Sequence, residues 1–240
     1  MGILHNLPYR TVGYAMGLAM HACNSLAMFA AMRGDVTKDP DIMFLKDNQF
    51  KYITIWNVIF QMLFLSMAVV CDVSLMMNGP GEHRALGLLR SYSRIFFGGV
   101  VWPCSTTIFV IFWPMYIYDR ELLFPAYIDK VLSQLSNHAM HTSILPIAVW
   151  ALIFQTDNKP RHQFWYKFHL VTVFVTYIGF LLYNHRVTGS WPYPIMNMIY
   201  GTPYFPVFFV IILIFYIYLY SVQWRVVEFI KDRCPKLKTV

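Results

Sequence analysis

Charged side chains are scarce in this sequence. Asp, Glu, Lys and Arg make up 13% of its 240 residues, whereas a soluble domain carries roughly 25%. With 58% hydrophobic residues the chain belongs in a bilayer, and its 18% aromatic content fits two interfacial belts of Trp and Tyr. The net charge of +7 does not indicate nucleic acid as a partner, because the basic residues flank apolar runs and act as a topology signal.

Cysteine, glycosylation signals and repeats are also rare or missing. Four cysteines do not make a disulfide framework, although Cys234 in the basic tail is a candidate for S-palmitoylation. No Asn-X-Ser/Thr sequence occurs, so N-glycosylation is not expected. The first apolar run is long enough to span a bilayer, which argues against a cleaved signal peptide. Without a repeat or a long linker, residues 1–240 form a single domain.

Six apolar runs approach the length of a membrane-spanning helix, which is about 20 residues for a hydrocarbon core of roughly 30 Å. They cover residues 11–32, 52–76, 95–118, 140–154, 168–184 and 203–224. The runs do not alternate apolar and polar residues, as the strands of a membrane barrel do. The predicted fold is therefore all-α, a polytopic membrane protein built as a bundle of six transmembrane helices.

The positively charged residues predict the orientation of this bundle. Twelve Lys and Arg residues fall on the side of the two termini, and seven fall on the other side. Because cytoplasmic loops carry the excess of Lys and Arg, both termini are predicted to be cytoplasmic. Lys236 and Lys238 stand fifth and third from the C-terminus, as in the dilysine retrieval pattern of endoplasmic reticulum membrane proteins. We expect that membrane, with the plasma membrane as the alternative.

This topology brings polar residues of four spans to the same non-cytoplasmic face, where we expect a shared pocket. They are Thr54 and Asn57, then Asp119, Arg120 and Glu121, then Asn137, His138, His141 and Thr142, and finally Asn184, His185 and Arg186. Ionisable residues at such a depth are functional candidates by default. Neutral imidazole is a competent general base, and a hydroxyl within its reach is the minimum equipment for covalent acyl transfer.

Simpler interpretations of the same residues stay open. A helical threonine such as Thr54 commonly bonds back to a carbonyl one turn earlier, and the simpler interpretation of His138 is an interfacial residue exposed to water. A zinc site built from histidines 138, 141 and 185 with Asp119 is a second alternative. A third is a non-enzymatic lipid-binding or regulatory protein whose polar residues only hold helices together. Asp72 lies about 27 Å along a helix from Thr54 and cannot join the same site.

Several sequence blocks resemble the androgen-induced protein family. They are Phe112-Trp113, Tyr118-Asp-Arg-Glu121, Asn137-His-Ala-Met-His-Thr142, His185-Arg-Val-Thr-Gly-Ser-Trp191 and Tyr193-Pro194. The resemblance implies a six-span membrane hydrolase of fatty acid esters of hydroxy fatty acids, with a threonine nucleophile and a histidine base and no metal or cofactor. Its threonine corresponds to Thr54 in Lys51-Tyr-Ile-Thr54, and its histidine corresponds to His141.

The resemblance also suggests supporting residues and one departure. Familiar members carry an acidic residue three positions after the threonine, where this chain has Asn57, so activity or specificity is expected to differ. Candidates that would orient the base or stabilise an oxyanion are Asn57, Asn137, His138 and His185. Arg120 or Arg186 would hold the free carboxylate of the lipid ester. The expected partners are this ester and the bilayer, and the sequence does not fix the oligomeric state.

Overall fold

The computed structural model describes residues 6–33, 38–79, 84–155 and 159–233, and nearly all of them are helical with no strand among them. The prediction of an all-α protein is confirmed. In chain order the elements are α1 (Leu7–Ala31), α2 (Pro40–Asn48), η2 (Gln49–Lys51), α3 (Ile53–Asn78), α4 (Arg84–Phe96), the π-helical turn η3 (Phe97–Val101), α5 (Trp102–Asp119), η4 (Arg120–Leu122), η5 (Ala126–Lys130), α6 (Gln134–His141), α7 (Ile144–Ile153), α8 (Phe164–Thr188), α9 (Pro194–Ile199) and α10 (Tyr204–Arg233).

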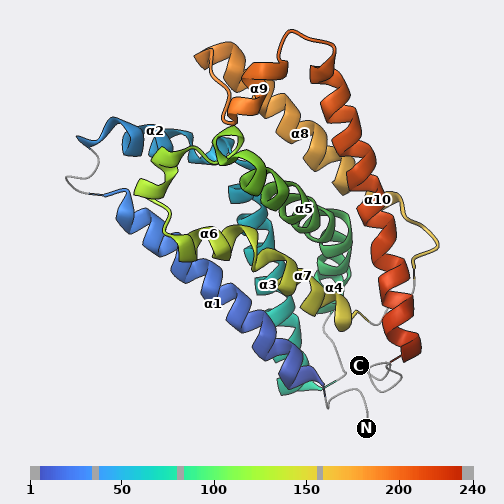
Figure 1. The fold of residues 1–240 in the computed structure, drawn as a ribbon. Helices are drawn as coiled ribbons and strands as arrows, with labels where there is room; N and C mark the ends of the chain where they lie inside the picture. The colour runs from blue at the N-terminus through green and yellow to red at the C-terminus, as the bar shows by residue number, and fades with distance from the viewer. Residues whose placement is uncertain (1–5, 34–37, 80–83, 156–158, 234–240) are drawn as a thin grey trace.

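Four helical segments within the described residues are long and apolar enough to cross a membrane. They are α3, the continuous stretch Arg84–Leu122, α8 and α10. The chain is therefore a multi-pass integral membrane protein. α1 has 25 residues, about 37 Å at 1.5 Å per residue, but it also carries polar side chains such as His21 and Asn24. The six-span count and the cytoplasmic location of the termini stay predictions, although the start of α1 and the end of α10 lie at one end of the molecule (Figure 1).

The run predicted as the fourth span, residues 140–154, is not one continuous helix. α6 ends at His141 and α7 begins at Ile144, because Pro146 lacks the N–H that would donate to the carbonyl of Thr142 and continue the ladder across this point. At the break the N–H groups of Thr142 and Ser143 both donate to the carbonyl of His138, at 2.9 Å each. His141 is therefore the last residue of a short helix that reaches into the protein.

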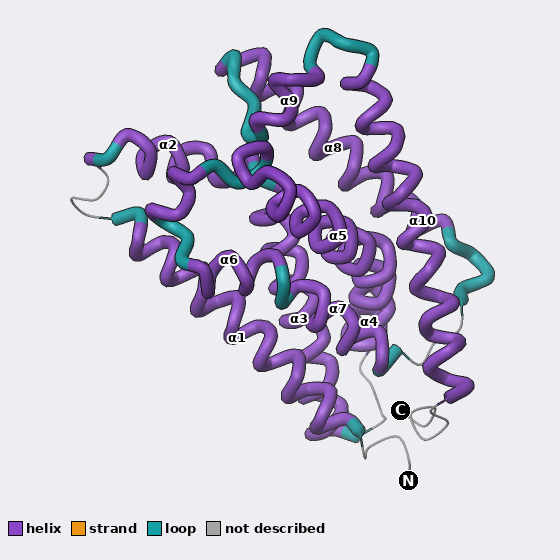
Figure 2. Tube along the Cα trace, in the orientation of Figure 1, coloured by secondary structure: helices purple, strands orange, loops and turns teal. Residues whose placement is uncertain are grey.

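The helices form two flanks around a central group. In Figures 1 and 2, α1 and α2 lie on one side, α8, α9 and α10 lie on the other, and α3, α5, α6 and α7 run between them.

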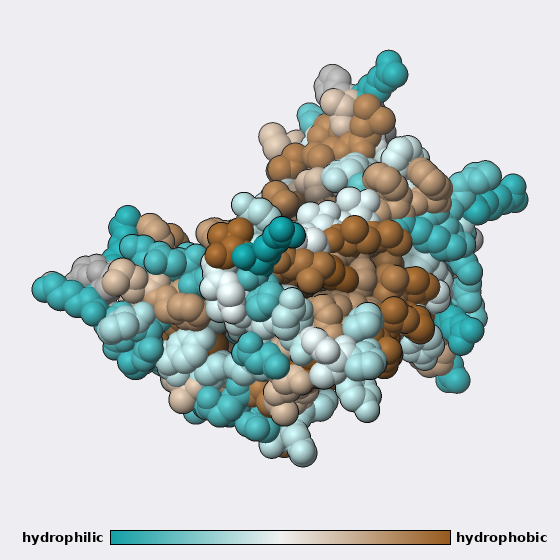
Figure 3. Space-filling model, turned by 90° about the horizontal axis from the view of Figure 1, so that it is seen from above, coloured by the Kyte–Doolittle hydropathy of each residue, from teal (hydrophilic) through white to brown (hydrophobic). Residues whose placement is uncertain are grey.

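α8 and α10 bury little of their apolar surface inside the protein, with exposed side chains such as Val175, Ile211 and Ile214. Viewed from above, hydrophilic side chains gather at the left over the region of α2 and again along the right edge, and broad hydrophobic surface lies at the centre and toward the upper edge (Figure 3). The outer faces of α8 and α10 are thus suited to lipid.

The π-helical turn η3 lets α8 approach closely. A Cβ on Gly99 would lie 2.6 Å from the backbone oxygen of Tyr166, and one on Gly98 would lie 3.0 Å from the Tyr166 ring. Only glycine leaves room for this approach of two backbones. α8 is thereby fixed near its start against the middle of the Arg84–Leu122 stretch, and its central part borders the cavity described below.

Candidate active site

Thr54 and His141 meet inside the protein. Thr54 is the second residue of α3 and His141 is the last residue of α6, and both side chains are buried. The Oγ1 atom of Thr54 lies 3.2 Å from Nε2 of His141, which is within the range for proton transfer from a nucleophile to a base. The two candidates predicted from the sequence are therefore in hydrogen-bond contact.

Asn137 fixes the protonation state of this histidine. Nδ1 of His141 lies 2.7 Å from Oδ1 of Asn137 and 3.1 Å from the Asn137 carbonyl oxygen. A carbonyl oxygen only accepts, so Nδ1 carries the proton and donates it. Nε2 of the neutral ring then has a free lone pair, and the hydroxyl of Thr54 donates to it. Hydroxyl, imidazole and amide form one relay in which each group orients the next.

Aromatic side chains hold the imidazole in place. The Phe112 ring stacks on His141 with a centroid separation of 3.6 Å and an angle of 8° between the planes, and Phe124 presents its edge at 6.3 Å. These rings exclude water from two sides of the imidazole, and a desolvated site strengthens every polar interaction inside it. Phe112 belongs to one of the sequence blocks quoted above, but its role as a stacking partner could not be read from the sequence.

Tyrosines anchor the start of α3, where Thr54 lies. The N–H of Ile53 donates to the hydroxyl of Tyr193 at 2.9 Å, and the hydroxyl of Tyr177 donates to the carbonyl of Lys51 at 3.0 Å. The two tyrosine hydroxyls are 3.2 Å apart, so Tyr193 donates to Tyr177. Tyr177 of α8 and Tyr193 of the α8–α9 connection thus hold the start of the helix that carries the candidate nucleophile, a role for Tyr193 that sequence reasoning missed.

Thr54 and His141 open on to a cavity of about 220 Å³ with an almost entirely apolar lining. One end is lined by α1, α2 and the η5 region, and the other by α8, α9 and α10, so the cavity crosses the molecule between the two flanks of Figure 1. The first end includes Met28, Leu45, Ile128 and Leu132, and the second includes Val173, Phe174, Phe209 and Ile212. The polar pair lies between two apolar arms.

Asn57 lies in a buried polar network rather than on the cavity. Its Oδ1 accepts from Oγ of Ser105 at 3.0 Å, and Ser105 in turn accepts from Nε2 of Gln61 at 2.8 Å. Gln61 also contacts Nε2 of His21 through its Oε1, at 2.6 Å. This network ties α1, α3 and α5 together one turn below Thr54.

The remaining predicted residues are not brought to the pair. His138 is exposed, lies 2.9 Å from Oγ1 of Thr142 through Nδ1, and stacks on Trp113. His185 stacks on Trp191 at 4.0 Å, away from the cavity lining, and Arg186 is exposed. The expectation that these residues would share the pocket of His141 is wrong, because each side chain leaves its helix in another direction.

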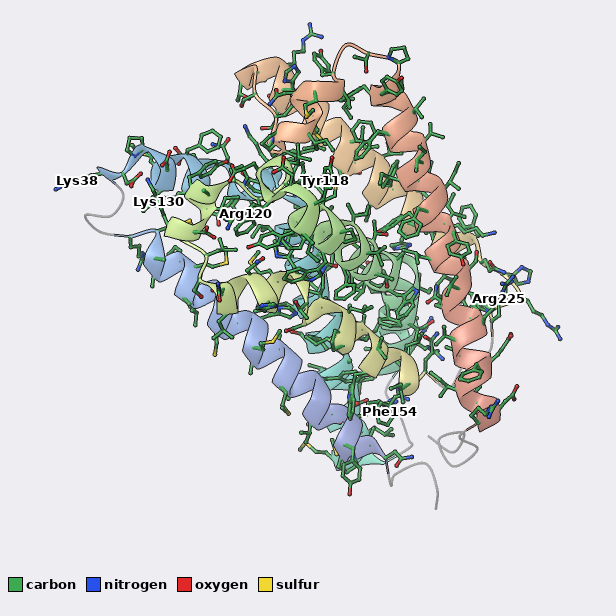
Figure 4. All side chains as sticks on the ribbon, viewed as in Figure 1. Lys38, Tyr118, Arg120, Lys130, Phe154 and Arg225 are labelled. Atoms are coloured by element: carbon green, nitrogen blue, oxygen red, sulfur yellow. The ribbon has the colours of Figure 1, made fainter. Side chains whose placement is uncertain are left out.

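Arg120 has a structural contact instead of a free guanidinium. It pairs with Asp129 at 2.7 Å and donates to the carbonyl of Phe124 at 3.2 Å. Figure 4 labels Arg120 and Lys130 near α2, at the opposite end of the molecule from Phe154. Arg120 therefore fastens the loop whose Phe124 borders both His141 and the cavity, rather than projecting into the site.

The zinc arrangement considered from the sequence is not formed. In residues 6–33, 38–79, 84–155 and 159–233, no three His, Cys, Asp or Glu side chains are grouped so that they could hold a metal ion. Asp72 is distant from Thr54, as its position on α3 predicted. Its Oδ2 accepts from Nε of Arg10 at 2.9 Å, beside a separate cavity of about 130 Å³ that Phe154 also lines.

Comparison with known proteins identifies the family. The model of the FAR-17a/AIG1-like protein family matches residues 16–226. The chain belongs to this family.

The androgen-dependent TFPI-regulating protein of Mus musculus is 31% identical over 148 residues, which are 61% of this chain and 62% of that protein. The androgen-induced gene 1 protein of Homo sapiens is 29% identical over 158 residues, 62% of this chain and 64% of that protein. The chain thus matches less than two thirds of the length of either relative, and no solved structure matches it. The resemblance inferred from the sequence blocks is confirmed.

Proposed function

We propose that the protein is an intramembrane lipid-ester hydrolase that cleaves fatty acid esters of hydroxy fatty acids through an acyl-threonine intermediate. The observation that carries this proposal is the hydrogen bond between Thr54 and His141 at the wall of an apolar cavity. A hydroxyl activated by an adjacent base is the common requirement of nucleophilic acyl transfer.

The residues supply each proton that the reaction moves. Oγ1 of Thr54 attacks the ester carbonyl carbon while its proton passes to Nε2 of His141. The bond to the hydroxy fatty acid oxygen breaks, and that oxygen takes the proton from His141, which leaves an acyl-threonine. Water then attacks the acyl carbon and gives a proton to His141, and this proton returns to Oγ1 of Thr54 as the fatty acid departs.

The form of the cavity supports a substrate with two chains. An ester of a fatty acid and a hydroxy fatty acid has an apolar chain on each side of the scissile bond, and the lining places an apolar arm on each side of Thr54 and His141. The family resemblance implies the same substrate class. For cellular location we propose the endoplasmic reticulum. Lys236 and Lys238, which suggest retrieval, and Cys234, the candidate for palmitoylation, lie outside the described residues.

The test is hydrolysis of such an ester by purified protein in detergent or nanodiscs. Thr54→Ala and His141→Ala are each expected to lower kcat by on the order of 10²–10⁴-fold, the usual contribution of a positioned base or its nucleophile. Thr188→Ala and His169→Ala are matched controls, because neither side chain lines the cavity: Thr188 bonds to the Asn184 carbonyl and to Ser190, and His169 bonds to the Trp165 carbonyl and contacts the Tyr92 ring. A fluorophosphonate probe should label the wild type and spare Thr54→Ala.

Two results would contradict the proposal. Full turnover by either active-site variant removes the mechanism. A wild-type protein that binds the ester without cleaving it favours the lipid-binding alternative, in which the polar residues serve only packing. Thermal unfolding of each variant separates lost chemistry from lost structure.

A further inference from the structure

A second cavity lies toward the other end of α3 from the candidate active site. Its volume is about 130 Å³ and its lining includes Asp72, which is about 27 Å along the helix from Thr54. Phe154 also lines it and lies at the end of the molecule where α1 begins (Figure 4). The distribution of Lys and Arg predicts that this end faces the cytoplasm. The cavity is therefore separate from the site of Thr54 and His141.

Side chains converge on this second cavity from one face of each of two helices. Arg90, Ser93 and Arg94 line it from α4, three and four residues apart, and Arg10 and Tyr14 line it from α1, one turn apart. Residues at these spacings lie on the same side of a helix. The charged and hydroxyl-bearing side chains thus surround one space instead of being scattered around the helix ends.

Positive charge exceeds negative charge in the lining. Among its described residues three are arginines, Arg10, Arg90 and Arg94, and Asp72 is the only acid. Asp72 accepts from Nε of Arg10 at 2.9 Å and from Oγ1 of Thr11 at 3.1 Å, so its carboxylate is held by α1. Arg90 and Arg94 have contacts of their own, but a guanidinium has five N–H donors and can bind a ligand oxygen as well.

Two hydroxyls of the lining make no hydrogen bond to any residue that the structure describes. They belong to Ser93 and Tyr14, and both residues are buried. A hydroxyl in a helix can bond to a carbonyl one turn earlier, as Thr11 bonds to Leu7 at 2.8 Å, but Ser93 does not. Because buried polar groups are nearly always hydrogen-bonded, these two hydroxyls indicate that a polar ligand supplies their partner.

Much of the remaining lining is apolar. It includes the rings of Phe64, Phe97 and Phe154 and the methyl groups of Ala68 and Ala151. A small free ion makes no favourable contact with such a surface, whereas a membrane lipid carries its phosphate close to apolar chain carbons. Basic pockets between transmembrane helices on the cytoplasmic side bind anionic lipid head groups in this way.

We propose that this cavity binds the phosphate group of an anionic membrane lipid. The guanidinium groups of Arg90 and Arg94 donate to the phosphate oxygens, a pairing that suits the planar fork of arginine. The hydroxyls of Ser93 and Tyr14 donate to the same group. This binding site is independent of the proposed hydrolase activity.

The experiment measures thermal unfolding of the full chain in a neutral detergent with added lipid. The lipid is the dialkyl ether form of phosphatidic acid, which contains no carboxylic ester for the proposed hydrolase to cleave. At about 100 times its Kd it is expected to raise Tm by about 5–10 °C. The dialkyl ether form of phosphatidylcholine, whose phosphate is balanced by its own choline, should raise Tm by less than half of this shift. Inorganic phosphate alone should change Tm by less than about 1 °C.

Three variants locate the binding site, and a fourth is their control. Arg90→Gln and Arg94→Gln each remove one charged donor and are expected to raise the Kd for phosphatidic acid by on the order of 10–100-fold. Ser93→Ala removes a hydroxyl without changing the charge and should raise this Kd at least about threefold. Arg84→Gln is the matched control, because it removes the same charge from the same helix but Arg84 does not line the cavity, and it should change the Kd less than about threefold.

Each contrary result overturns a stated part of the inference. If Arg84→Gln weakens binding as much as Arg94→Gln, the lipid responds to surface charge in general and the cavity is not its site. Equal shifts with phosphatidic acid and phosphatidylcholine remove the selectivity for an anion. If inorganic phosphate alone gives the full shift, the cavity is an ion site and the lipid assignment is wrong. Should Arg90→Gln not fold, the exposed Arg94 provides the same criterion. None of these readouts needs turnover, so the hydrolase proposal and this inference can fail separately.

Discussion

The strength of the contact between Asn137 and His141 can be tested by Asn137→Ala. In the structure two acceptors share the proton on Nδ1 of His141, the side-chain oxygen of Asn137 at 2.7 Å and its backbone carbonyl at 3.1 Å. The substitution removes the first acceptor and leaves the second. The imidazole therefore keeps its proton on Nδ1, and Nε2 still faces Thr54.

The expected loss is the contribution of one neutral hydrogen bond. Such a bond contributes about 0.5–1.5 kcal/mol, which corresponds to a decrease in kcat of roughly 2- to 13-fold. His141→Ala, which removes the base itself, should lose on the order of 10²–10⁴-fold. The assay is steady-state hydrolysis of a fatty acid ester of a hydroxy fatty acid. Asn184→Ala is the matched control, since that amide bonds only to the Phe180 carbonyl in its own helix.

Two results would refute this reasoning. If Asn137→Ala were as inactive as His141→Ala, the amide would do more than orient the ring, and the backbone carbonyl would not hold the proton. If it kept full wild-type turnover, the bond at 2.7 Å would contribute nothing to orientation. Circular dichroism and thermal unfolding in the same detergent show whether each variant is folded.

Two further predictions concern the fold. Gly99→Ala should destabilise the protein by about 1–3 kcal/mol, because the new methyl would lie 2.6 Å from the Tyr166 carbonyl oxygen. The control Gly179→Ala has open space around the new methyl and should keep or raise the melting temperature. Equal melting temperatures of the two variants would contradict the close approach of Gly99 to Tyr166. The exposed pair of Lys130 and Asp39, 2.8 Å apart, lowers the pKa of the Asp39 carboxyl. It therefore stabilises the α2 region above the ordinary Asp pKa of about 3.9, and this contribution is lost as the pH falls through the lowered pKa. Hydrogen exchange of α2 should show loosening in that acidic range in the wild type and a smaller pH step in Lys130→Gln, in which the backbone N–H of Asp41 still donates to the Asp39 carboxylate.

The sequence predicted the class of fold, and the two residues that it singled out, Thr54 and His141, lie in hydrogen-bond contact. Long apolar runs predict where the helices lie. A segment inside a bilayer must satisfy its backbone hydrogen bonds within itself and cover its backbone with apolar side chains. The break near His141 was missed, although Pro146 marks it. A proline signals that a ladder is interrupted, but whether a buried helix kinks, continues or restarts there depends on the side chains that pack around it.

Spacing alone could not separate the two histidines of α6. Residues three apart lie on neighbouring positions of a helix, about 60° apart around its axis. The edge of the cavity passes between them, so His141 is buried against Phe112 while His138 is exposed beside Trp113. The packing of the neighbouring helix decides which of the two side chains points inward, and a single sequence does not contain that information.

The place of Asn57 changes how its departure from familiar members is interpreted. An acid at this position, one turn after Thr54, was expected to act on the base. Here the side chain bonds to Ser105 in the network that sets the height of α3 against α5. Because Thr54 lies one turn before Asn57 on the same helix, a change at residue 57 would act on the proposed catalysis through the position of Thr54. The network that packs α3 against α5 thus also helps to position the nucleophile of the proposed reaction.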